Sequence, residues 1–463
     1  MSISPELEFE SYQCASQALV ALIRGERYAS DSTITRRQRA EAKLERIRAM
    51  LKAVGNPQDR YPVVHVTGTS GKGSTAASVA SMLTAAGYRA GLHTSPYLQV
   101  ATEKLQIGPH LIDAGSFAHM AARVLGTAAH LFPLEKAELP FSYAEAWSVL
   151  GYWWFADRNV DVAVVEVGAG GRFDPTNVID PIVSVITSVG FDHRVTLGPG
   201  ITDIAWHKAG IIKPGATAVV GELPTAALAV VSKEAKSASV DLIQAYHNEG
   251  TRMSFSSSAG RFQERNAEVA TAVASVLVQR GFKISDAAIA EGLISTRLPG
   301  RLERMPGNAK PAVWIDGAHN EDKVAALAAE AVDRVGGGAL PVIVVGMLSS
   351  KDACGVLAKL APVAASIVTT EPSVSGRESL AANALAGAVL ASGFAGGVHC
   401  EPNPDAAMRF AEVIAKHEGA PVLVTGSVYL TGQVRRRWFR DPEIVVQRTP
   451  WPASTEASKL RSP

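Results

Sequence analysis

The chain has few cysteines, almost no net charge and no long apolar run, and each shortage narrows the classes of protein it can belong to. Only three of its 463 residues are cysteines (Cys14, Cys354 and Cys400), and they lack metal-binding spacing, so we expect reduced thiols and a cytoplasmic protein. The 45 basic against 44 acidic residues give a net charge of +1, which predicts no binding of nucleic acid or of an anionic membrane. No stretch approaches the roughly 20 apolar residues of a membrane span, and the acidic first residues predict no signal peptide.

What the chain does have is a glycine-rich stretch between an apolar run and an alanine-rich run. Residues 63–75 read Val-Val-His-Val-Thr-Gly-Thr-Ser-Gly-Lys-Gly-Ser-Thr. The apolar start predicts a buried strand over 63–66, and residues 76–86 predict a helix. Glycines between a strand and a helix let backbone N–H groups surround phosphate oxygens at the helix N-terminus. The stretch therefore indicates a P-loop that holds a nucleoside triphosphate.

Within this stretch, side chains are assigned by their positions in the loop. Lys72 is predicted to reach the β- and γ-phosphates, and Ser74 or Thr75 to face the metal ion that bridges them. The pattern departs from a strict P-loop because Val66 occupies the first glycine position and Gly73 precedes the hydroxyls. A plain glycine turn is the alternative, but such a turn does not require Lys72.

The length and the alternation of elements predict two α/β domains. A chain of 463 residues exceeds one ordinary core. Strands over 162–167 and 182–187 are apolar throughout, which is typical of a parallel sheet covered on both faces. Proline and glycine interrupt the pattern after residue 297. We expect a P-loop NTPase-like domain with an N-terminal helical segment over 1–297 and a smaller, Rossmann-like domain over 298–463.

Further elements follow from local pattern. The second domain is predicted to contain strands over 313–316, 342–346, 367–369 and 422–426, with helices over 323–335 and 406–416. In the first domain we expect a basic amphipathic helix within 27–52, turns or short strands over 244–262, and a helix over 266–281. The tail from Trp451 to Ser458 is predicted to be unstructured.

Polar residues follow several apolar strands, at the end where α/β proteins bind ligands. Ser95 follows a short strand over 90–93, Glu166 lies in the strand over 162–167, and His193 follows the strand over 182–187. A hydroxyl, a carboxylate and an imidazole near a P-loop suit magnesium, which takes a few protein ligands besides phosphates and water. For Glu166 alone the alternative is a buried ion pair with Arg172, and for His193 alone a simple loop histidine.

Several motifs, taken in order, resemble those of the Mur ligase superfamily, and most of all its folylpolyglutamate synthase/dihydrofolate synthase family. They are Gly68-Thr-Ser-Gly-Lys-Gly-Ser-Thr, Thr94-Ser-Pro, Glu166-Val-Gly-Ala-Gly-Gly-Arg-Phe-Asp-Pro-Thr-Asn, Asp192-His, Lys208-Ala-Gly-Ile-Ile-Lys-Pro-Gly, Leu298-Pro-Gly-Arg, Asp316-Gly-Ala-His-Asn and Val424-Thr-Gly-Ser. The resemblance spans roughly residues 40–435. It implies that ATP phosphorylates a carboxylate and that the amine of an amino acid then attacks the acyl phosphate.

The resemblance also implies a role for individual residues. Lys72, Lys208 and His319 are implied to be catalytic, and Lys208 matches a lysine that is carbamylated in the family. The implied metal ligands are Ser95, Glu166, His193 and the Lys208 carbamate. The implied ATP-binding residues are Gly68, Thr69, Ser70, Gly71, Lys72, Gly73, Ser74, Thr75, Gln263, Asn266, Arg301 and Asp316. The implied substrate-loop residues are Tyr97, Glu103, Lys104, Arg172 and Asp174.

One loop departs from the family pattern. After Thr94-Ser-Pro the folate enzymes usually place His, Arg, an aromatic residue and Arg where this chain has Tyr97, Val100, Ala101 and Lys104. The family uses this loop to contact the pterin-bearing substrate. Losing an aromatic face and a cation predicts weak binding of pterin acids, although Tyr97 or the basic helix within 27–52 can compensate.

The resulting prediction is a monomeric enzyme of folate biosynthesis and one-carbon metabolism. It uses ATP, two Mg²⁺ ions and, as a further expectation, K⁺, and joins L-glutamate to a folate or pteroate carboxylate. Two alternatives stay open at this point. One is a related ligase for a non-folate acid, and the other is a nucleotide-dependent switch that forms no bond. ATP hydrolysis that requires both an acid and an amino acid would exclude the switch.

Overall fold

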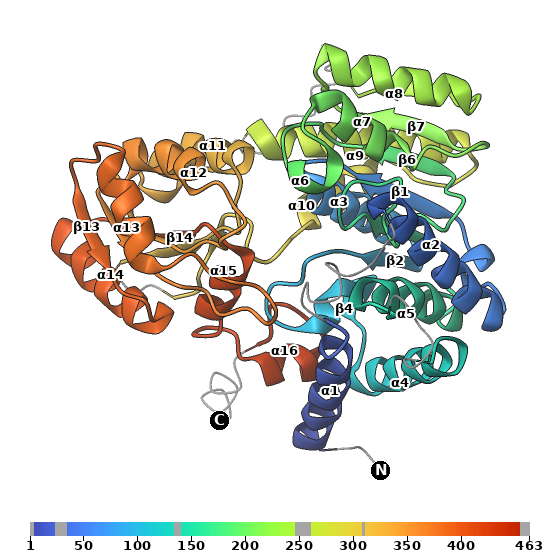
Figure 1. Ribbon diagram of the computed structural model, residues 1–463, viewed down its shortest axis with the longest axis horizontal. Helices are drawn as coiled ribbons and strands as arrows, with labels where there is room; N and C mark the ends of the chain where they lie inside the picture. Colours follow the sequence, from blue (N-terminus) through green and yellow to red (C-terminus); the bar gives the residue numbers. More distant parts are fainter. Residues whose placement is uncertain (1–3, 24–34, 134–139, 246–260, 308–310, 454–463) are drawn as a thin grey trace. The chain divides into compact units, whose positions relative to one another are not determined.

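The computed structural model describes residues 4–23, 35–133, 140–245, 261–307 and 311–453 (Figure 1). The chain divides into two compact units. Unit 1 consists of Met1–Tyr97, Ala101–Arg297 and Val445–Thr449, and unit 2 of Leu98–Val100, Leu298–Ile444 and Pro450–Pro463. The chain therefore passes between the units more than once, and a three-residue piece of the predicted substrate loop belongs to unit 2.

Unit 1 is built on an eight-stranded sheet in the order β4-β3-β2-β5-β1-β6-β7-β8. The strands are β1 (Val63–Thr67), β2 (Ala90–His93), β3 (Leu105–Ile107), β4 (His110–Leu111), β5 (Val162–Glu166), β6 (Val183–Ile186), β7 (Thr217–Val220) and β8 (Leu242–Gln244). Only β3 and β4, at one edge, run antiparallel to their neighbours. The sheet is mostly parallel, as predicted, because β1, β5 and β6 are buried at every position and have no polar face for water.

Helices cover both faces of this sheet. The helices of unit 1 are α1 (Pro5–Val20), α2 (Arg36–Ala53), α3 (Lys72–Ala85), α4 (Ala114–Leu131), α5 (Tyr143–Asp157), α6 (Arg194–Leu197), α7 (Ile201–Ala209), α8 (Thr225–Ser237), α9 (Arg261–Gln279) and α10 (Asp286–Ser295), with 3₁₀ turns η2 (Pro57–Arg60) and η3 (Ala101–Lys104). Helices α9 and α10 pack against α3 on one face, whereas α7 and α8 enclose the core beside β6 and β7 on the other (Figure 1). The glycine-rich loop between β1 and α3 therefore starts from a central strand of a covered sheet.

Unit 2 contains a six-stranded sheet in the order β13-β12-β11-β14-β10-β9, in which only β9 is antiparallel. Its strands are β9 (Glu303–Arg304), β10 (Val313–Ile315), β11 (Val342–Val345), β12 (Ser366–Thr369), β13 (Gly397–Cys400) and β14 (Val422–Thr425). Its helices are α11 (Glu321–Glu330), the π-helical turn η5 (Ala331–Val335), α12 (Ala353–Leu360), the 3₁₀ turn η6 (Ala361–Val363), α13 (Ala382–Ala391), α14 (Pro404–Glu418) and α15 (Val428–Arg435). The division between the units falls within α16 (Asp441–Gln447).

The core of unit 2 shows why the sheet is covered on both faces. Along β11, Ile343 and Val345 pack with α11, α12 and α13, whereas Val342 and Val344 pack with α14 and α15. Alternate side chains of a strand point to opposite faces, so an unbroken Val/Ile run needs a helix layer on each side. This second α/β layer structure confirms the predicted fold class.

Most predicted elements are confirmed, and the errors lie at their ends. The P-loop helix begins at Lys72 rather than at 76, because Gly71 at φ 82° already turns the chain into its first turn. The helix predicted over 323–335 starts at Glu321 and changes to a π-helical turn after Glu330. Helix α9 begins at Arg261, so the predicted turn region is wrong at 261–262. The rest of the predicted turn region, over 246–260, and the predicted unstructured tail beyond 453 lie outside the described residues.

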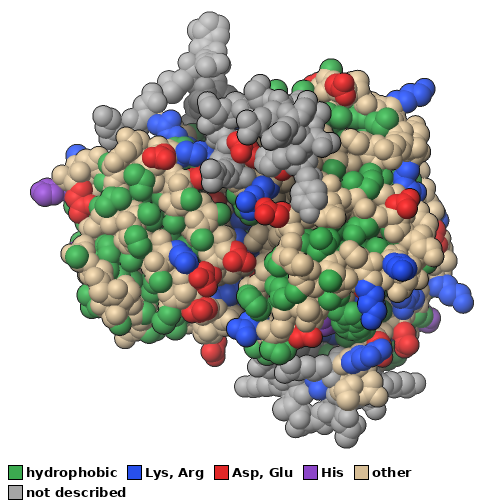
Figure 2. All heavy atoms as spheres, turned by 90° about the horizontal axis from the view of Figure 1, so that it is seen from above, with side chains coloured by type: hydrophobic (Ala, Val, Ile, Leu, Met, Phe, Trp, Pro, Cys, Tyr) green, Lys and Arg blue, Asp and Glu red, His purple; other side chains and the backbone are tan. Residues whose placement is uncertain are grey.

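Surface composition agrees with the balanced charge. On the face shown in Figure 2, basic and acidic side chains are interspersed among apolar and uncharged groups. No helix within the described ranges is both long enough and apolar enough to cross a membrane.

Candidate active site

The glycine-rich loop between β1 and α3 is held by hydrogen bonds to the segment that follows β6. The backbone N–H of Ser70 donates to Ser188 Oγ at 2.9 Å, and Thr187 Oγ1 donates to the Ser70 carbonyl at 2.6 Å. A side chain at Gly68 would place its Cβ 1.9 Å from Thr187 Oγ1, so only glycine fits. The loop therefore has a preformed shape, and Thr187 and Ser188 support it. Sequence reasoning missed both, since their only signal is a position directly after a buried strand.

Three buried polar groups at this loop have no hydrogen-bond partner within the described residues. They are Ser70 Oγ, Thr75 Oγ1 and Asn266 Nδ2. The Asn266 side chain, on α9, lies against Gly71 and is buried. Buried polar groups in folded proteins are normally satisfied. Hydroxyl and amide groups left without a partner at a helix N-terminus fit the oxygens of a bound phosphate chain.

The contact between Gly71 and Asn266 leads to a testable expectation. A Cβ at Gly71 would lie 2.1 Å from Asn266 Oδ1, at a φ of 82° that L-residues rarely adopt. We expect Gly71→Ala to lower the free energy of unfolding by roughly 1–3 kcal/mol and to weaken ADP binding about tenfold or more. Thermal unfolding and calorimetric titration with ADP measure the two effects.

Gly87 provides the matched control. It lies just beyond the other end of α3 with φ 87°, and a Cβ there would meet no atom within 4 Å. Gly87→Ala should therefore lose stability from backbone strain while keeping its affinity for ADP. Equal loss of ADP affinity in both variants would show that the contact with Asn266 has no part in binding.

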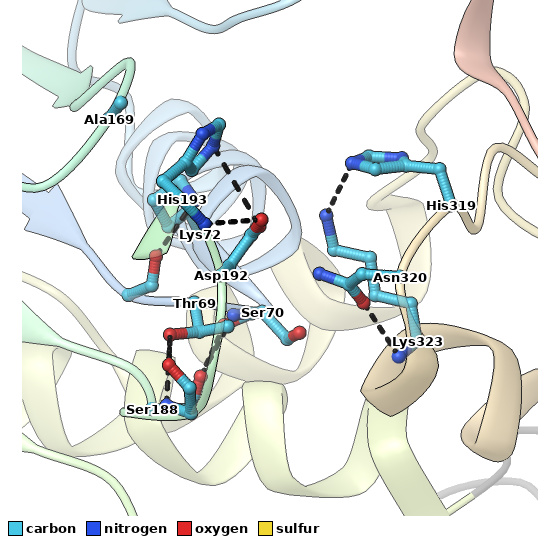
Figure 3. A network of polar contacts seen from close by, with 12 residues as sticks. Thr69, Ser70, Lys72, Ala169, Ser188, Asp192, His193, His319, Asn320 and Lys323 are labelled. Atoms are coloured by element: carbon cyan, nitrogen blue, oxygen red, sulfur yellow. Dashed lines mark hydrogen bonds and ion pairs between the residues drawn. The ribbon is translucent and has the colours of Figure 1, made fainter. Parts of the chain in front are cut away.

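Lys72, Asp192 and His193 form a charged group beside the loop. Figure 3 shows the three side chains pointing toward one another. Lys72 Nζ donates to the Gly68 carbonyl at 2.8 Å, and Asp192 Oδ2 lies 3.8 Å from His193 Nε2. The Lys72 ammonium is thus held against the backbone of the loop. Asp192 was not assigned a role from sequence, although it directly precedes the predicted ligand His193.

Glu166 and Ser95 lie together next to the start of α3. Glu166 ends β5 with 4% of its surface exposed, and its Oε2 accepts the backbone N–H of Ser95 at 2.9 Å. A Cβ at Gly73 would be 3.4 Å from the same oxygen. Parallel β2, β5 and β1 end side by side, which brings these residues to the P-loop. Within the described ranges, the ion pair of Arg172 is formed with Glu234 and not with Glu166, as the alternative interpretation would require.

Lys208 lies in α7 and is buried, with 3% of its surface exposed. From its helix position alone it would be an exposed lysine. The end of α7 packs on the loop after Glu166, where the backbone N–H of Arg172 donates to the His207 carbonyl at 2.6 Å. A Cβ at Gly171 would lie 3.0 Å from the Lys208 carbonyl. Glycine at 171 therefore lets the helix that carries Lys208 approach this loop.

The predicted substrate-loop residues are buried or half-buried. Glu103 and Lys104 are buried, and Tyr97 is half-buried. Lys104 Nζ lies 4.7 Å from the centre of the Trp147 ring, and burial lowers its pKa to about 8, although Glu166 and Asp174 act to raise it.

Asp174 and Arg172 are both anchored within unit 1. Asp174 accepts the backbone N–H of Ala169 at 2.9 Å and the Thr176 hydroxyl at 2.6 Å. Arg172 stacks at 4.1 Å over the Trp206 ring. Both side chains therefore help to hold the glycine-rich loop that follows Glu166.

Unit 2 carries a separate polar group at the end of β10. Asp316 accepts the backbone N–H groups of Leu302 at 2.7 Å and Ala318 at 2.8 Å. Desolvation raises the pKa of Asp316 above its ordinary value, although Arg301 acts to lower it. His319 Nδ1 lies 2.8 Å from the Gly317 carbonyl, and its Nε2 is 3.4 Å from Lys323 Nζ (Figure 3). The predicted residues Arg301, Asp316 and His319 thus gather in one place within unit 2.

The residues present in unit 1 fit a nucleotide and a hard cation. Ser70, Thr75 and Asn266 offer unsatisfied polar atoms, and Glu166 offers a buried carboxylate next to them. Gln263 is half-buried on α9, one turn before Asn266. Within the ranges that the structure describes, no three His, Cys, Asp or Glu side chains gather as a metal cluster. Magnesium bound to a nucleotide needs few protein ligands because phosphates and water complete its shell.

The phosphate-binding loop on a parallel sheet and the second doubly covered sheet define a two-unit α/β protein of the nucleotide-binding class. Comparison with known proteins gives the family. A family model described as Mur ligase, glutamate ligase domain, matches residues 300–428. The dihydrofolate synthase/folylpolyglutamate synthase of Bacillus subtilis is 32% identical over 419 residues, covering 85% of this chain and 94% of that protein. The Mycobacterium tuberculosis protein of the same name is 32% identical over 454 residues, covering 88% and 92%.

Solved structures of folylpolyglutamate synthases are also similar to this chain. Mycobacterium tuberculosis folylpolyglutamate synthase complexed with ADP superposes with a TM-score of 0.80 at 30% identity, covering 94% of this chain and all of that one. An FPGS–AMPPCP–folate complex gives a TM-score of 0.71 at 28% identity, covering 92% and 99%. The chain belongs to the folylpolyglutamate synthase/dihydrofolate synthase family of the Mur ligase superfamily.

Proposed function

We propose that this protein is an ATP-dependent ligase that joins L-glutamate to the carboxylate of a folate or pteroate, as its relatives' names describe for them. The γ-phosphoryl group of ATP passes to the acid, the glutamate amine attacks the acyl phosphate, and an amide, ADP and phosphate result. The observation that carries the proposal is the set of buried polar groups of Ser70, Thr75 and Asn266 that have no hydrogen-bond partner within the described residues, together with the buried Glu166 carboxylate beside the start of α3. The family comparison does not favour the non-folate alternative.

Each side chain has a defined part in this proposal. The backbone of Gly68–Thr75 and the Asn266 amide bind the phosphate chain, and Lys72 holds its outer phosphates. Magnesium would supply charge neutralisation on the phosphates. Ser95, Glu166, His193 and a Lys208 carbamate are the residues proposed to hold two such ions, with K⁺ as a further proposed ion. In unit 2, Arg301, Asp316 and His319 are proposed to act on the nucleotide.

Other assignments remain proposals on the same basis. We propose residues 1–297 and 298–463 as the two functional domains, a monomer, and action in the cytoplasm. The three cysteines are all exposed and unbridged, which supports a reducing compartment.

The function is tested by measuring ADP release with purified protein. We expect release to require ATP, L-glutamate and either dihydropteroate or tetrahydrofolate, with little release when the acid or the amino acid is omitted. A matched reaction with benzoate as the acid controls for non-specific use of carboxylates. ADP release that is independent of both acids and of glutamate would instead fit a nucleotide-dependent switch.

Kinetics also test the departures in the substrate loop. Val100 and Ala101 are buried, with 0% and 2% of their surfaces exposed, so neither offers the aromatic face or cation of the usual loop. Ring stacking contributes roughly 0.5–1.5 kcal/mol and a charge-assisted hydrogen bond roughly 1.5–3 kcal/mol. We therefore expect KM values for both pterin acids above the micromolar range. Micromolar KM values would mean that other residues, such as Tyr97, compensate fully.

A further inference from the structure

Unit 1 contains a pocket of about 350 Å³ that the proposed reaction does not use. It is lined by Arg89, Ile107, Gly108, His110, Asp113, Trp154, Arg158 and Arg448. Three of these eight residues are arginines, and Asp113 is the only acidic one. The lining therefore carries more basic than acidic side chains, although the charge of the whole chain is balanced.

The pocket lies at the opposite end of the sheet from the phosphate-binding loop. Arg89 directly precedes β2, whose other end leads to Ser95. Strands β2, β5 and β1 run parallel, so the start of β2 and the end of β1 lie at opposite ends of the strands. A four-residue strand separates these two ends by about 13 Å. The pocket is therefore a site distinct from the one proposed for ATP.

Two arginines of the pocket, Arg89 and Arg448, have guanidinium nitrogens that make no hydrogen bond with the described residues. The Arg89 side chain makes no hydrogen bond or ion pair with the residues described, and its backbone N–H donates to Asp161 at 2.7 Å. Arg448 donates from Nε to the Leu111 carbonyl at 2.9 Å, and Leu111 returns a backbone N–H to the Arg448 carbonyl at 2.9 Å. This reciprocal pair holds Arg448 in place and leaves its terminal nitrogens for another partner.

The acidic groups nearby are already engaged. Asp113 accepts the backbone N–H and the hydroxyl of Ser116, each at 2.7 Å, and lies 3.9 Å from Arg158. Asp157 lies 3.9 Å from Arg158 outside the pocket lining. Burial acts to raise the pKa of Asp113, but the Ser116 hydrogen bonds, Arg448 and Arg158 outweigh it and hold the pKa below its ordinary value. Within the lining itself, three arginines therefore stand against one carboxylate, and that carboxylate is already bound by Ser116.

We propose that this pocket binds a compact anion with at least two phosphate or carboxylate groups. Guanidinium groups bind both kinds of oxyanion through paired N–H donors, and Arg89 and Arg448 present such donors from two separate segments. The exposed side chains of Arg158 and His110 add further N–H donors at the rim. Trp154 and Ile107 also line the pocket, and its volume of about 350 Å³ suits a small molecule.

Calorimetric titration of the full chain with two probes tests the proposal. Inorganic pyrophosphate represents the phosphate source and citrate the carboxylate source, each titrated with saturating ADP present so that the P-loop is occupied. We expect one site for at least one probe, with affinity that falls as salt is added. Arg89→Ala should weaken it about tenfold or more, and Arg89→Glu should weaken it further. Arg89→Ala is chosen because the Arg89 side chain is exposed and makes no hydrogen bond or ion pair with the described residues, so the fold should be retained.

Arg37→Ala is the matched control. Arg37 is an exposed arginine of unit 1 that pairs with Glu41 on α2, and its loss should leave binding unchanged. The probe that binds more tightly identifies the preferred group. Unchanged affinity in Arg89→Glu would overturn the proposal, as would the absence of binding for both probes up to about 10 mM. Neither result depends on whether the protein is a folate ligase.

Discussion

Replacing Lys72 by alanine is expected to remove most ATP-dependent turnover while leaving the fold intact. Lys72 lies between Gly71 and Gly73 in the first turn of α3, and within the loop its ammonium donates to the Gly68 carbonyl. Losing one hydrogen bond of this kind costs about 1 kcal/mol of stability. Losing a cation that stabilises transferring phosphate oxygens is expected to lower kcat roughly 10²–10³-fold. ADP release and circular dichroism measure activity and fold separately.

Lys236→Ala is the matched control for this variant. Lys236 is an exposed lysine in the last turn of α8, in the same unit but away from the P-loop. It should keep wild-type ADP release. If Lys72→Ala also keeps near wild-type release, the assignment of the loop as a phosphate site is wrong.

Replacing Lys208 by alanine is expected to abolish activity, and a small added carboxylate should restore part of it. Lys208 is buried, and α7 carries it to the loop that follows Glu166. We propose that its ammonium loses a proton and that the resulting amine reacts with carbon dioxide to form a carbamate and release a second proton. A cation is thereby converted into an anion able to face magnesium. A lost anionic ligand of this kind is expected to lower kcat roughly 10²-fold or more. Rates measured with and without added formate or acetate test the rescue.

The choice of substitution makes this prediction specific. Lys208→Arg keeps a permanent positive charge and leaves no space for an external anion, so it should be inactive and not rescued. Lys233→Ala, an exposed lysine on α8, should remain fully active with or without carboxylate. Full activity in Lys208→Ala, or an unmodified amine in a structure determined under carbon dioxide, would rule out the carbamate.

Much of the fold follows directly from local sequence. Continuous apolar runs such as those of β1, β5 and β11 predict strands buried on both faces, and the spacing of Gly68, Gly71 and Lys72 predicts a phosphate loop. These features depend on residues close together in the chain, so they can be recognised without tertiary structure. The ends of helices are not fixed by local sequence in the same way, since the change to a π-helical turn at Ala331–Val335 has no comparable local signal.

For individual residues, too, sequence motifs indicate some features and tertiary structure determines others. The motif order alone indicates Ser95, Glu166, His193 and Lys208 as functional, but not that Lys208 is buried or that Arg172 pairs with Glu234 instead of Glu166. These outcomes depend on how α7 and α8 pack on the sheet. A helix pattern defines which residues share a face, but the partner of that face comes from elsewhere in the chain.

Tertiary structure alone decided the support of the P-loop and the existence of the arginine pocket. Thr187 and Ser188 contact Ser70 across about 117 residues of chain. Arg89 and Arg448 come together because Arg448 is hydrogen-bonded to Leu111 of the edge strand β4, in the same sheet as β2, which Arg89 directly precedes. No single stretch of sequence contains either arrangement. Their physical cause is the pairing of distant segments, in which each residue's contribution depends on neighbours that local sequence does not reveal.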